Sequence, residues 1–581
     1  MKFKLLITLC FILQILYSFG QAGRNFIDTT PAQEGWVDSV FRKLNRKEKI
    51  AQLFFIRAHT DKGKAYEESV ATIIKKNKVG GLVFFQGGPG RQAALTNVYQ
   101  SISEVPLLIA MDAEWGLGMR LDSTMSYPYQ MALGAIQDTN LIYQMGKRIA
   151  GDFKRIGMHV NFAPVVDVNN NPNNPVINYR SFGDNKYNVA QKGAAYMQGL
   201  QDAGILVSIK HFPGHGDTNV DSHYDLPVLN FTKERLDSLE MYPFKELIRK
   251  GASGVMVAHM NIPSLDTTSK LPSTLSTPIV TGLLKEKLGF KGLIFSDAME
   301  MKGVVKNFPD GEADVHAVIA GNDVIELSED APRSIKLLRK AIRAKRLTMD
   351  RINESVKKIL AAKYWAGLDK PVNLDTSNVY EDLNGAEAMV LNQRLSDAAI
   401  TVLKSDSLIK QLDVTRKTAV ISLGATEVSP FQKEIQKRFT NSTNFIISKI
   451  ASAADIKNVS KSLRSYDQII VAIHDYRLRP QSKLDYNDEL KAFIADISSL
   501  NTVTCLFANP YTIPGFPGIE KSKSLIVGYQ NNVQMQLAAA KVLSNQMQAS
   551  GRLPVTVNSF FKTGDGIQFF PVQKAVTGQV N

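Results

Sequence analysis

The chain has 581 residues, of which 44% are hydrophobic and 21% are charged. This composition excludes a fibrous or largely disordered protein, and the length predicts two or three globular domains. The formal net charge is +14. Because Lys and Arg are spread along the chain with no block of five like charges, we expect no nucleic-acid partner. A basic surface that suits an anionic cell envelope or an acidic polymer is the simpler interpretation.

Residues 1–20 have the layout of a secretory signal peptide. MKFK supplies positive charge, LLITLCFILQILY is an apolar run, and small residues precede a cleavage site after Gly20. The run is shorter than the ~20 residues of a membrane-spanning helix. We therefore expect an exported protein, periplasmic or secreted, with no membrane span. Cys10 leaves with the signal, so Cys505 alone excludes an intramolecular disulfide and a Cys-based zinc site.

Residues 35–370 alternate apolar runs with segments of helical spacing, such as NLIYQMGKRIAGDFKRIG. Near-continuous apolar strands that alternate with helices indicate parallel strands covered by helices. Eight such units predict a (β/α)8 TIM-like barrel. The predicted strands are 52–58, 80–86, 106–114, 158–168, 205–212, 254–260, 292–298 and 322–327.

A second, smaller α/β domain, a sandwich of helices around a sheet, is predicted over residues 395–557. Residues 371–394 are predicted to be a helical linker before it, and residues 558–581 a tail or a further linker. The predicted strands of the second domain are 418–424, 444–450, 468–475, 502–511 and 524–530.

Polar residues follow several predicted barrel strands at the point where each strand ends. In a barrel of this kind the carboxyl ends of the strands form the catalytic face. Convergence of several independent strand ends on one face favours a functional site over chance. These residues are Asp112, Glu114, Asp167, Lys210, His211, His259 and Asp297.

The fifth of these strands leads into KHFPGHGDTNVDSH, residues 210–223, which holds three of the eight histidines. Pro213 and Gly214 break the helix that would align His211 and His215 on one metal ion, so we expect no catalytic metal and no cofactor. Asp221 and His223 are spaced for a turn in which the carboxylate orients the imidazole and stabilises its charged form. The loop is therefore interpreted as a proton-transfer device, with a polar surface loop as the simpler alternative.

Asp297 ends the apolar strand GLIFSDA, so its carboxylate should be held rigidly at the barrel mouth. An aspartate at this place also commonly caps the next helix. A carboxylate nucleophile with an acid nearby is, however, what retaining glycoside hydrolysis requires, with an Asp–His pair replacing the second carboxyl.

The chain resembles glycoside hydrolase family 3, in its β-N-acetylglucosaminidase branch. The signature loop KHFPGHG followed by DSH carries the resemblance, with IAMDAEWGLGMRL, NFAPVVDV, INYRSFG, VMVAHMNIPSLD and GFKGLIFSDAMEMKGV in the family's order. ANPY and GRLPVTV resemble the family's second domain. The sequence departs from the family's pattern at Trp115 and Ala298, which leaves the aglycone in question.

The resemblance implies a role for each site residue. Asp297 is expected to be the nucleophile, His223 the acid/base and Asp221 its partner. The expected sugar-binding residues are Asp112, Arg120, Arg180, Lys210 and His211. Internal ion pairing of Arg180 and Lys210 with Asp167 or Asp112 is the structural alternative.

We therefore expect an exported, retaining exo-β-N-acetylglucosaminidase that acts on peptidoglycan fragments or chito-oligosaccharides. A β-glucosidase or a phosphorylase of the same family is one alternative, because a histidine acid/base repels phosphate less than a carboxylate does. A non-catalytic cell-wall-binding protein is an alternative of another class, against which the intact Asp297 and His223 argue.

Overall fold

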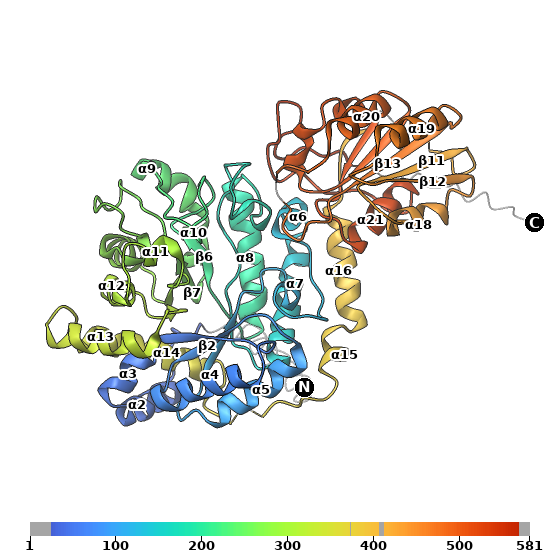
Figure 1. Ribbon diagram of the computed structural model, residues 1–581. Helices are drawn as coiled ribbons and strands as arrows, with labels where there is room; N and C mark the ends of the chain where they lie inside the picture. The colour runs from blue at the N-terminus through green and yellow to red at the C-terminus, as the bar shows by residue number, and fades with distance from the viewer. Residues whose placement is uncertain (1–24, 372, 406–408, 410–411, 481, 569–581) are drawn as a thin grey trace, which may run out of the picture.

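The computed structural model describes residues 25–371, 373–405, 409, 412–480 and 482–568. The predicted signal peptide lies outside the described residues, as does the predicted tail from residue 569 onward. Figure 1 shows two bodies connected by α15 (Val379–Leu383) and α16 (Ala386–Ala399). Over the described ranges, each helix is too short or too polar to cross a bilayer.

The first body is a ring of short parallel strands. Hydrogen bonding orders one part of the ring as β5-β4-β3-β2-β1-β9 and the other as β6-β7-β8. Bridges between Val165 and Lys210 and between Phe295 and Val324 join the two parts. The expected (β/α)8 barrel is thereby confirmed. The strands are β1 (Phe54–Ala58), β2 (Gly81–Phe84), β3 (Leu108–Met111), β4 (Val160–Asn161), β5 (Leu206–Val207), β6 (Ile209–Phe212), β7 (Gly254–Val257), β8 (Leu293–Ser296) and β9 (Ile325–Glu326).

Two strands are much shorter than the sequence predicts. β3 ends at Met111 and β4 at Asn161, whereas predicted strands ran to residues 114 and 168. Pro164 has no N–H for a ladder, and the polar residues beyond each end bond to other side chains instead. Residues 112–114 and 162–168, which the sequence predicted to be strand, therefore belong to the loops that carry the candidate site.

Helices cover the outside of the barrel (Figure 1). Side-chain caps begin several of them, including Asn45 before α3 and Asp138 before α7. The helices are α2 (Pro31–Lys43), α3 (Arg46–Ala51), α4 (Lys64–Asn77), α5 (Pro89–Ser101), α6 (Gln130–Ala135), α7 (Thr139–Arg155), α8 (Lys186–Asp202), α9 (Lys233–Arg235), α10 (Tyr242–Arg249), α11 (Lys302–Val305), α12 (Glu312–Ala320), α13 (Ala331–Arg343) and α14 (Met349–Trp365), with the π-helical segments η3 (Leu236–Glu240) and η5 (Pro278–Lys287).

Aromatic rings fill the inside of the barrel below the site. Phe295 contacts Phe55 and Phe162 edge to face, with ring centroids 6.2 and 5.4 Å apart. Because side chains alternate along a strand, the residues two positions further on also point inward, one layer higher. Arg57 and Asp297 therefore belong to the layer at the barrel mouth.

The second body is a sheet in the order β10-β15-β14-β13-β11-β12. The helices α19 (Ala453–Leu463) and α20 (Asp488–Ser498) cover one face, and α18 (Pro430–Gln436), α21 (Val533–Leu543) and α16 cover the other (Figure 1). The edge strand β10, antiparallel to β15, was not predicted, because its apolar residues continue the pattern of α16 without a break. The strands are β10 (Thr401–Ser405), β11 (Thr418–Leu423), β12 (Ser442–Ile447), β13 (Gln468–His474), β14 (Thr502–Phe507) and β15 (Ser524–Val527).

The second body is bonded to the barrel segment that follows β4. Asn169 Nδ2 donates to Tyr511 Oη at 3.1 Å, and Asn509 Nδ2 donates to Asn178 Oδ1. The Asp184 N–H donates to the carbonyl of Pro554 at 3.1 Å. Each of these bonds holds the long β4–α8 connection, which also carries Arg180.

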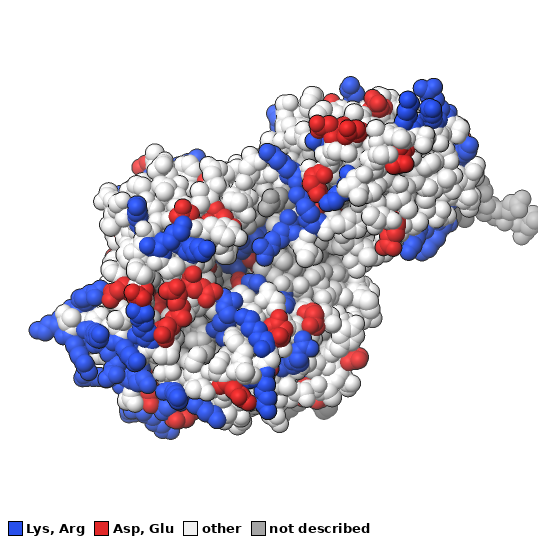
Figure 2. Space-filling model, viewed as in Figure 1, with Lys and Arg blue, Asp and Glu red and all other residues white. Residues whose placement is uncertain are grey.

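Charge on the surface is mixed, with one basic gathering. Figure 2 shows Lys and Arg interspersed with Asp and Glu, and concentrated at the lower left over α13. The exposed Lys336, Arg339, Lys340 and Arg343 recur at helical spacing along α13. Because three or four residues separate most of them, the sequence shows no continuous basic block here.

Candidate active site

Asp112 lies just beyond β3 between two cations. Its Oδ1 is 2.6 Å from Lys210 Nζ, and its Oδ2 is 2.6 Å from Arg120 Nη2. Burial alone would raise the pKa of Asp112, but the charges of Lys210 and Arg120 hold it well below its ordinary value. The structure thus brings two predicted sugar-binding residues, Lys210 and Arg120, to the ionised carboxylate of a third, Asp112.

Glu114 is buried and orients Arg180. Its carboxylate accepts from Arg180 Nε at 2.9 Å and Nη2 at 2.6 Å, and it lies 3.0 Å from Lys210 Nζ. Burial would raise its pKa, but Arg180 and Lys210 lower it to about 2. Lys210 pairs with Asp112, as the structural alternative predicted, whereas Arg180 pairs with Glu114 in place of the Asp167 or Asp112 of that alternative. Asp112 and Glu114 both follow the end of β3, and their spacing in the sequence does not show which of them pairs with Arg180.

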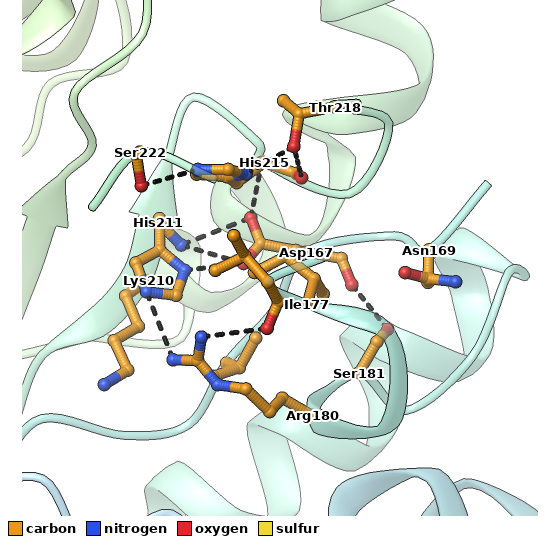
Figure 3. Close-up of polar contacts among 12 residues, drawn as sticks. Asp167, Asn169, Ile177, Arg180, Ser181, Lys210, His211, His215, Thr218 and Ser222 are labelled. Carbon is orange, nitrogen blue, oxygen red and sulfur yellow. Dashed lines mark hydrogen bonds and ion pairs between the residues drawn. The ribbon is translucent and has the colours of Figure 1, made fainter. Parts of the chain in front are cut away.

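Asp167 anchors the start of the His-rich loop (Figure 3). Its carboxylate lies 2.7 Å from His211 Nδ1 and accepts from the backbone N–H of His215 at 2.7 Å. Burial would raise the pKa of Asp167, and the interactions with His211 and His215 lower it. On its other side, His211 Nε2 lies 3.4 Å from Arg180 Nη2. The His211 ring is thereby held between the Asp167 carboxylate and the guanidinium of Arg180, a predicted sugar-binding residue.

The loop glycines allow close packing. A Cβ on Gly216 would stand 1.9 Å from the carbonyl oxygen of Val168, and Gly214 has φ +136° beside Glu240. Both glycines therefore have a packing role in the loop. His215 also stabilises the turn, because Nδ1 lies 2.8 Å from Thr218 Oγ1 and Nε2 lies 3.2 Å from Ser222 Oγ.

Beyond this turn, Asp221 and His223 form a pair that faces solvent. His223 Nδ1 lies 2.8 Å from Asp221 Oδ1, and the same oxygen accepts from the His223 backbone N–H at 2.9 Å. The His223 side chain is 62% exposed. The loop carrying the pair rests on the segment after β8, because a Cβ on Gly303 would stand 2.9 Å from the carbonyl oxygens of Ser222 and Asp225.

Asp297 follows β8 and points into the barrel mouth. Its N–H donates to Val257 O at 3.0 Å, and its Oδ1 accepts from the Ala298 N–H at 2.8 Å. Burial would raise its pKa, but His259, His211, the Ala298 N–H and His223 together lower it. Asp297 is not a helix cap, because the next helix, α11, begins only at Lys302. The lowered pKa favours the ionised form of this carboxylate at the barrel mouth.

His259 positions the strand end that carries Asp297. Its Nε2 lies 3.1 Å from the carbonyl of Ala298, and its Nδ1 lies 2.8 Å from Thr274 Oγ1. Its ring is fully buried. With Glu114 and Asp167, His259 belongs to a group that stood at predicted strand ends but was not assigned to the site. Their partners lie on distant segments, so no local motif identifies them.

An aromatic cluster lies at the edge of the site towards the second body. Trp115 contacts Tyr129 at a centroid distance of 4.7 Å, and Tyr129 contacts Tyr179 at 5.0 Å. The Tyr129 hydroxyl donates to the carbonyl of Leu478 in the second body at 3.0 Å. Trp115, one of the departures from the family's pattern, is thus part of a wall between the two bodies.

The two histidines considered as a metal pair bond to different protein groups. The His211 and His215 rings are 5.9 Å apart, and both nitrogens of His215 have hydroxyl neighbours. Across the described residues, the structure places no three His, Cys, Asp or Glu side chains where they could share an ion.

Comparison with known proteins identifies relatives over most of the chain. Residues 46–362 match the family model described as the glycosyl hydrolase family 3 N terminal domain. The chain is 29% identical over 553 residues to the β-hexosaminidase A of Pseudoalteromonas piscicida, covering 84% of this chain and 91% of that protein. It is 30% identical over 341 residues to the β-hexosaminidase LpqI of Mycobacterium tuberculosis, covering 55% of this chain and 83% of that one.

Among solved structures, a glycoside hydrolase family 3 β-N-acetylglucosaminidase from Paenibacillus sp. str. FPU-7 is similar with a TM-score of 0.74. The two chains are 29% identical, and the match covers 89% of this chain and 99% of the other. The β-glucoside phosphorylase BglX shares the fold at a TM-score of 0.78 and 22% identity, over 92% and 98% of the two chains.

Proposed function

Because the chain belongs to glycosyl hydrolase family 3 and is a β-N-acetylhexosaminidase, we propose that it removes terminal N-acetylglucosamine with retention of configuration. We further propose that it is exported and that its substrates are peptidoglycan fragments or chito-oligosaccharides. The apolar N-terminal run supports export, and the mature chain would begin at Gln21. The expected family is confirmed by the family match.

One observation carries the proposed mechanism. The half-buried carboxylate of Asp297, whose pKa is lowered, stands at the barrel mouth, and the loop with Asp221 and the exposed His223 rests on the segment that follows it. A rigid nucleophile and a solvent-accessible proton donor are the two groups that a retaining glycosidase needs. The ion-paired side chains of Asp112, Lys210 and Arg180 supply acceptors and donors for sugar hydroxyls and an acetamido group.

In the first step, an Asp297 oxygen attacks the anomeric carbon while His223 protonates the glycosidic oxygen. The bond between the anomeric carbon and that oxygen breaks, and the aglycone leaves with the proton. In the second step, neutral His223 takes a proton from water, whose oxygen attacks the same carbon and releases Asp297. Asp221 stabilises the charged imidazole before the first step and after the second.

The proposal is tested by comparing p-nitrophenyl N-acetyl-β-glucosaminide with the β-glucoside, each with and without phosphate. The enzyme should hydrolyse the N-acetylglucosaminide far faster, with water as the acceptor. Equal rates, or a glucoside preference, would contradict the substrate assignment. Glycosyl phosphate as the main product would instead identify a phosphorylase.

The nucleophile is tested with a 5-fluoro N-acetylglucosaminyl fluoride. Mass spectrometry should locate the adduct within GLIFSDAMEMK, and Asp297→Ala should lose nearly all activity because it lacks the bond-forming atom. Asp310→Ala, which removes an exposed carboxylate beyond the site, is the matched control. An adduct on another residue would transfer the role from Asp297.

A further inference from the structure

Glu326 is a carboxyl group at the barrel mouth to which the mechanism above assigns no role. It ends β9, where Phe55 is its ladder partner, and Val324 bridges to Phe295. Phe55 and Phe295 point into the barrel and contact each other. Since Asp297 lies two residues beyond Phe295 and Glu326 two beyond Val324, their side chains point inward side by side.

The outward-facing residues of the same segment confirm this direction. Asp323 bonds to the covering helix α14, where its Oδ1 accepts from Ser355 Oγ at 2.5 Å and its Oδ2 lies 3.3 Å from Lys358 Nζ. Glu326, three positions later, therefore has the opposite orientation. It faces the interior together with Arg57, Asp112 and Asp297.

The Glu326 side chain is buried without a protein partner for one oxygen. The residue is 3% exposed, and Oε2 has no hydrogen bond within the protein. Buried polar groups are normally paired, so an unpaired one at a binding site indicates a ligand contact. The alternative is a carboxyl group left in the core without a function.

Burial and the two neighbouring carboxylates favour the neutral form of Glu326. Burial, and then the carboxylates of Asp112 and Asp297, raise its pKa well above the ordinary value, against the opposing charges of Lys210 and Arg57. Both of these cations have other partners, since Lys210 pairs with Asp112 and Glu114, and Arg57 pairs with Glu300. A neutral carboxyl group beside an ionised one is a recurrent arrangement in enzymes that assign the two different tasks.

We propose that Glu326 is a further sugar-binding residue, which donates a hydrogen bond from its carboxylic acid to a hydroxyl group of the glycosyl unit attacked by Asp297. An ionised Asp112 only accepts hydrogen bonds, whereas a neutral carboxylic acid both donates and accepts. Glu326 thus complements Asp112 in orienting the ring. The inference depends on the proposed role of Asp297, which the adduct experiment tests separately.

The test compares Glu326→Leu with Glu326→Gln. Leucine fills the space without a donor, so kcat/KM should fall about 10- to 100-fold, while stability in denaturant should stay equal or rise because an unpaired buried carboxyl is gone. Glutamine keeps an N–H donor and a carbonyl and should recover most of the loss. Asp152→Leu, which removes a buried carboxyl of α7 outside the site, should keep wild-type kcat/KM.

Monodeoxy substrates identify the sugar hydroxyl group that Glu326 contacts. They also distinguish loss of this contact from a general structural effect of the substitution. The penalty of Glu326→Leu should persist on two of the 3-, 4- and 6-deoxy p-nitrophenyl N-acetyl-β-glucosaminides and vanish on the third. Should leucine not be tolerated, Glu326→Met gives the same comparison with an unbranched chain. Wild-type kcat/KM in a stable leucine or methionine variant, or an equal penalty on every analogue, would overturn the proposal.

Discussion

The two halves of the loop from Lys210 to Asp225 differ in burial and in the source of their partners. Residues 210–216 are buried and bond to Asp112, Asp167 and the chain around Val168. Residues 217–225 are mostly more exposed, and the Asp221–His223 bond is internal to them. Sugar recognition needs fixed charges, whereas proton transfer needs access to water and to the leaving group. In the proposed mechanism, one loop would meet both needs, because only its first half is buried.

The largest expected effect on activity and stability together is on the buried half. Gly216→Ala would place a Cβ 1.9 Å from the Val168 carbonyl, so the loop and the strand end must move apart. We expect a loss of more than 100-fold in kcat/KM and a clear fall in the melting temperature. Gly90→Ala, where no atom lies within 4 Å, is the matched control. A fully active, stable Gly216→Ala enzyme would contradict the packing role.

Substitutions in the exposed half should lower the catalytic rate and leave the stability of the fold unchanged. His223→Ala should cost roughly 10²- to 10⁴-fold on substrates with poor leaving groups, the range of general acid catalysis, and less on activated aryl glycosides. Azide should restore part of the rate by replacing water in the second step, and Asp221→Ala should show a milder form of the pattern. The neighbouring exposed Tyr224→Ala is the control. Equal losses on all leaving groups, without azide rescue, would make His223 a binding residue.

The ion pairs that hold the buried half should make the stability of the protein fall at acid pH. The pKa of Glu114 is lowered to about 2 from an ordinary value of 4.5. Glu114 therefore contributes stability above pH ~4.5, on the order of 3 kcal/mol, which is lost as the pH falls towards 2.

Glu114→Gln should consequently be less stable than the wild type at pH 6, and the difference should shrink towards pH 2. Denaturant titrations between pH 2 and 7 measure this convergence. The exposed Glu68→Gln should show no such trend. A constant difference at every pH would mean that the ion pair with Arg180 does not control the titration.

The smallest expected effect concerns the surface on which the exposed half rests. Gly303→Ala would place a Cβ 2.9 Å from the carbonyls of Ser222 and Asp225 and displace His223. We expect about a tenfold fall in kcat on poor leaving groups, with little change in melting temperature, because alanine favours the helix. Gly282→Ala in η5, with its nearest neighbour at 4.0 Å, is the control. An unchanged kcat would show that the resting position of the loop does not matter.

The sequence predicted the barrel because eight apolar runs alternate with helical patterns, and it predicted Asp297 because an aspartate ends one of those runs. It did not predict which acid pairs with Arg180, since Asp112, Glu114 and Asp167 all stand at strand ends and pairing depends on side-chain direction across the barrel. Glu326 was missed for a related reason. VIEL reads as an ordinary strand, and only closure of the ring between β8 and β9 places its carboxyl beside Asp297.

The hydrogen bonds between the second body, at Asn509 and Tyr511, and the segment after β4 bear on whether the barrel could keep its site without the second body. Asn178 accepts one of them and lies two residues before Arg180. The second body therefore supports the segment that carries Arg180, although it stands outside the barrel. Without this body, Asn169 and Asn178 would lose these partners, so the β4–α8 connection would need other contacts to hold Arg180 in place.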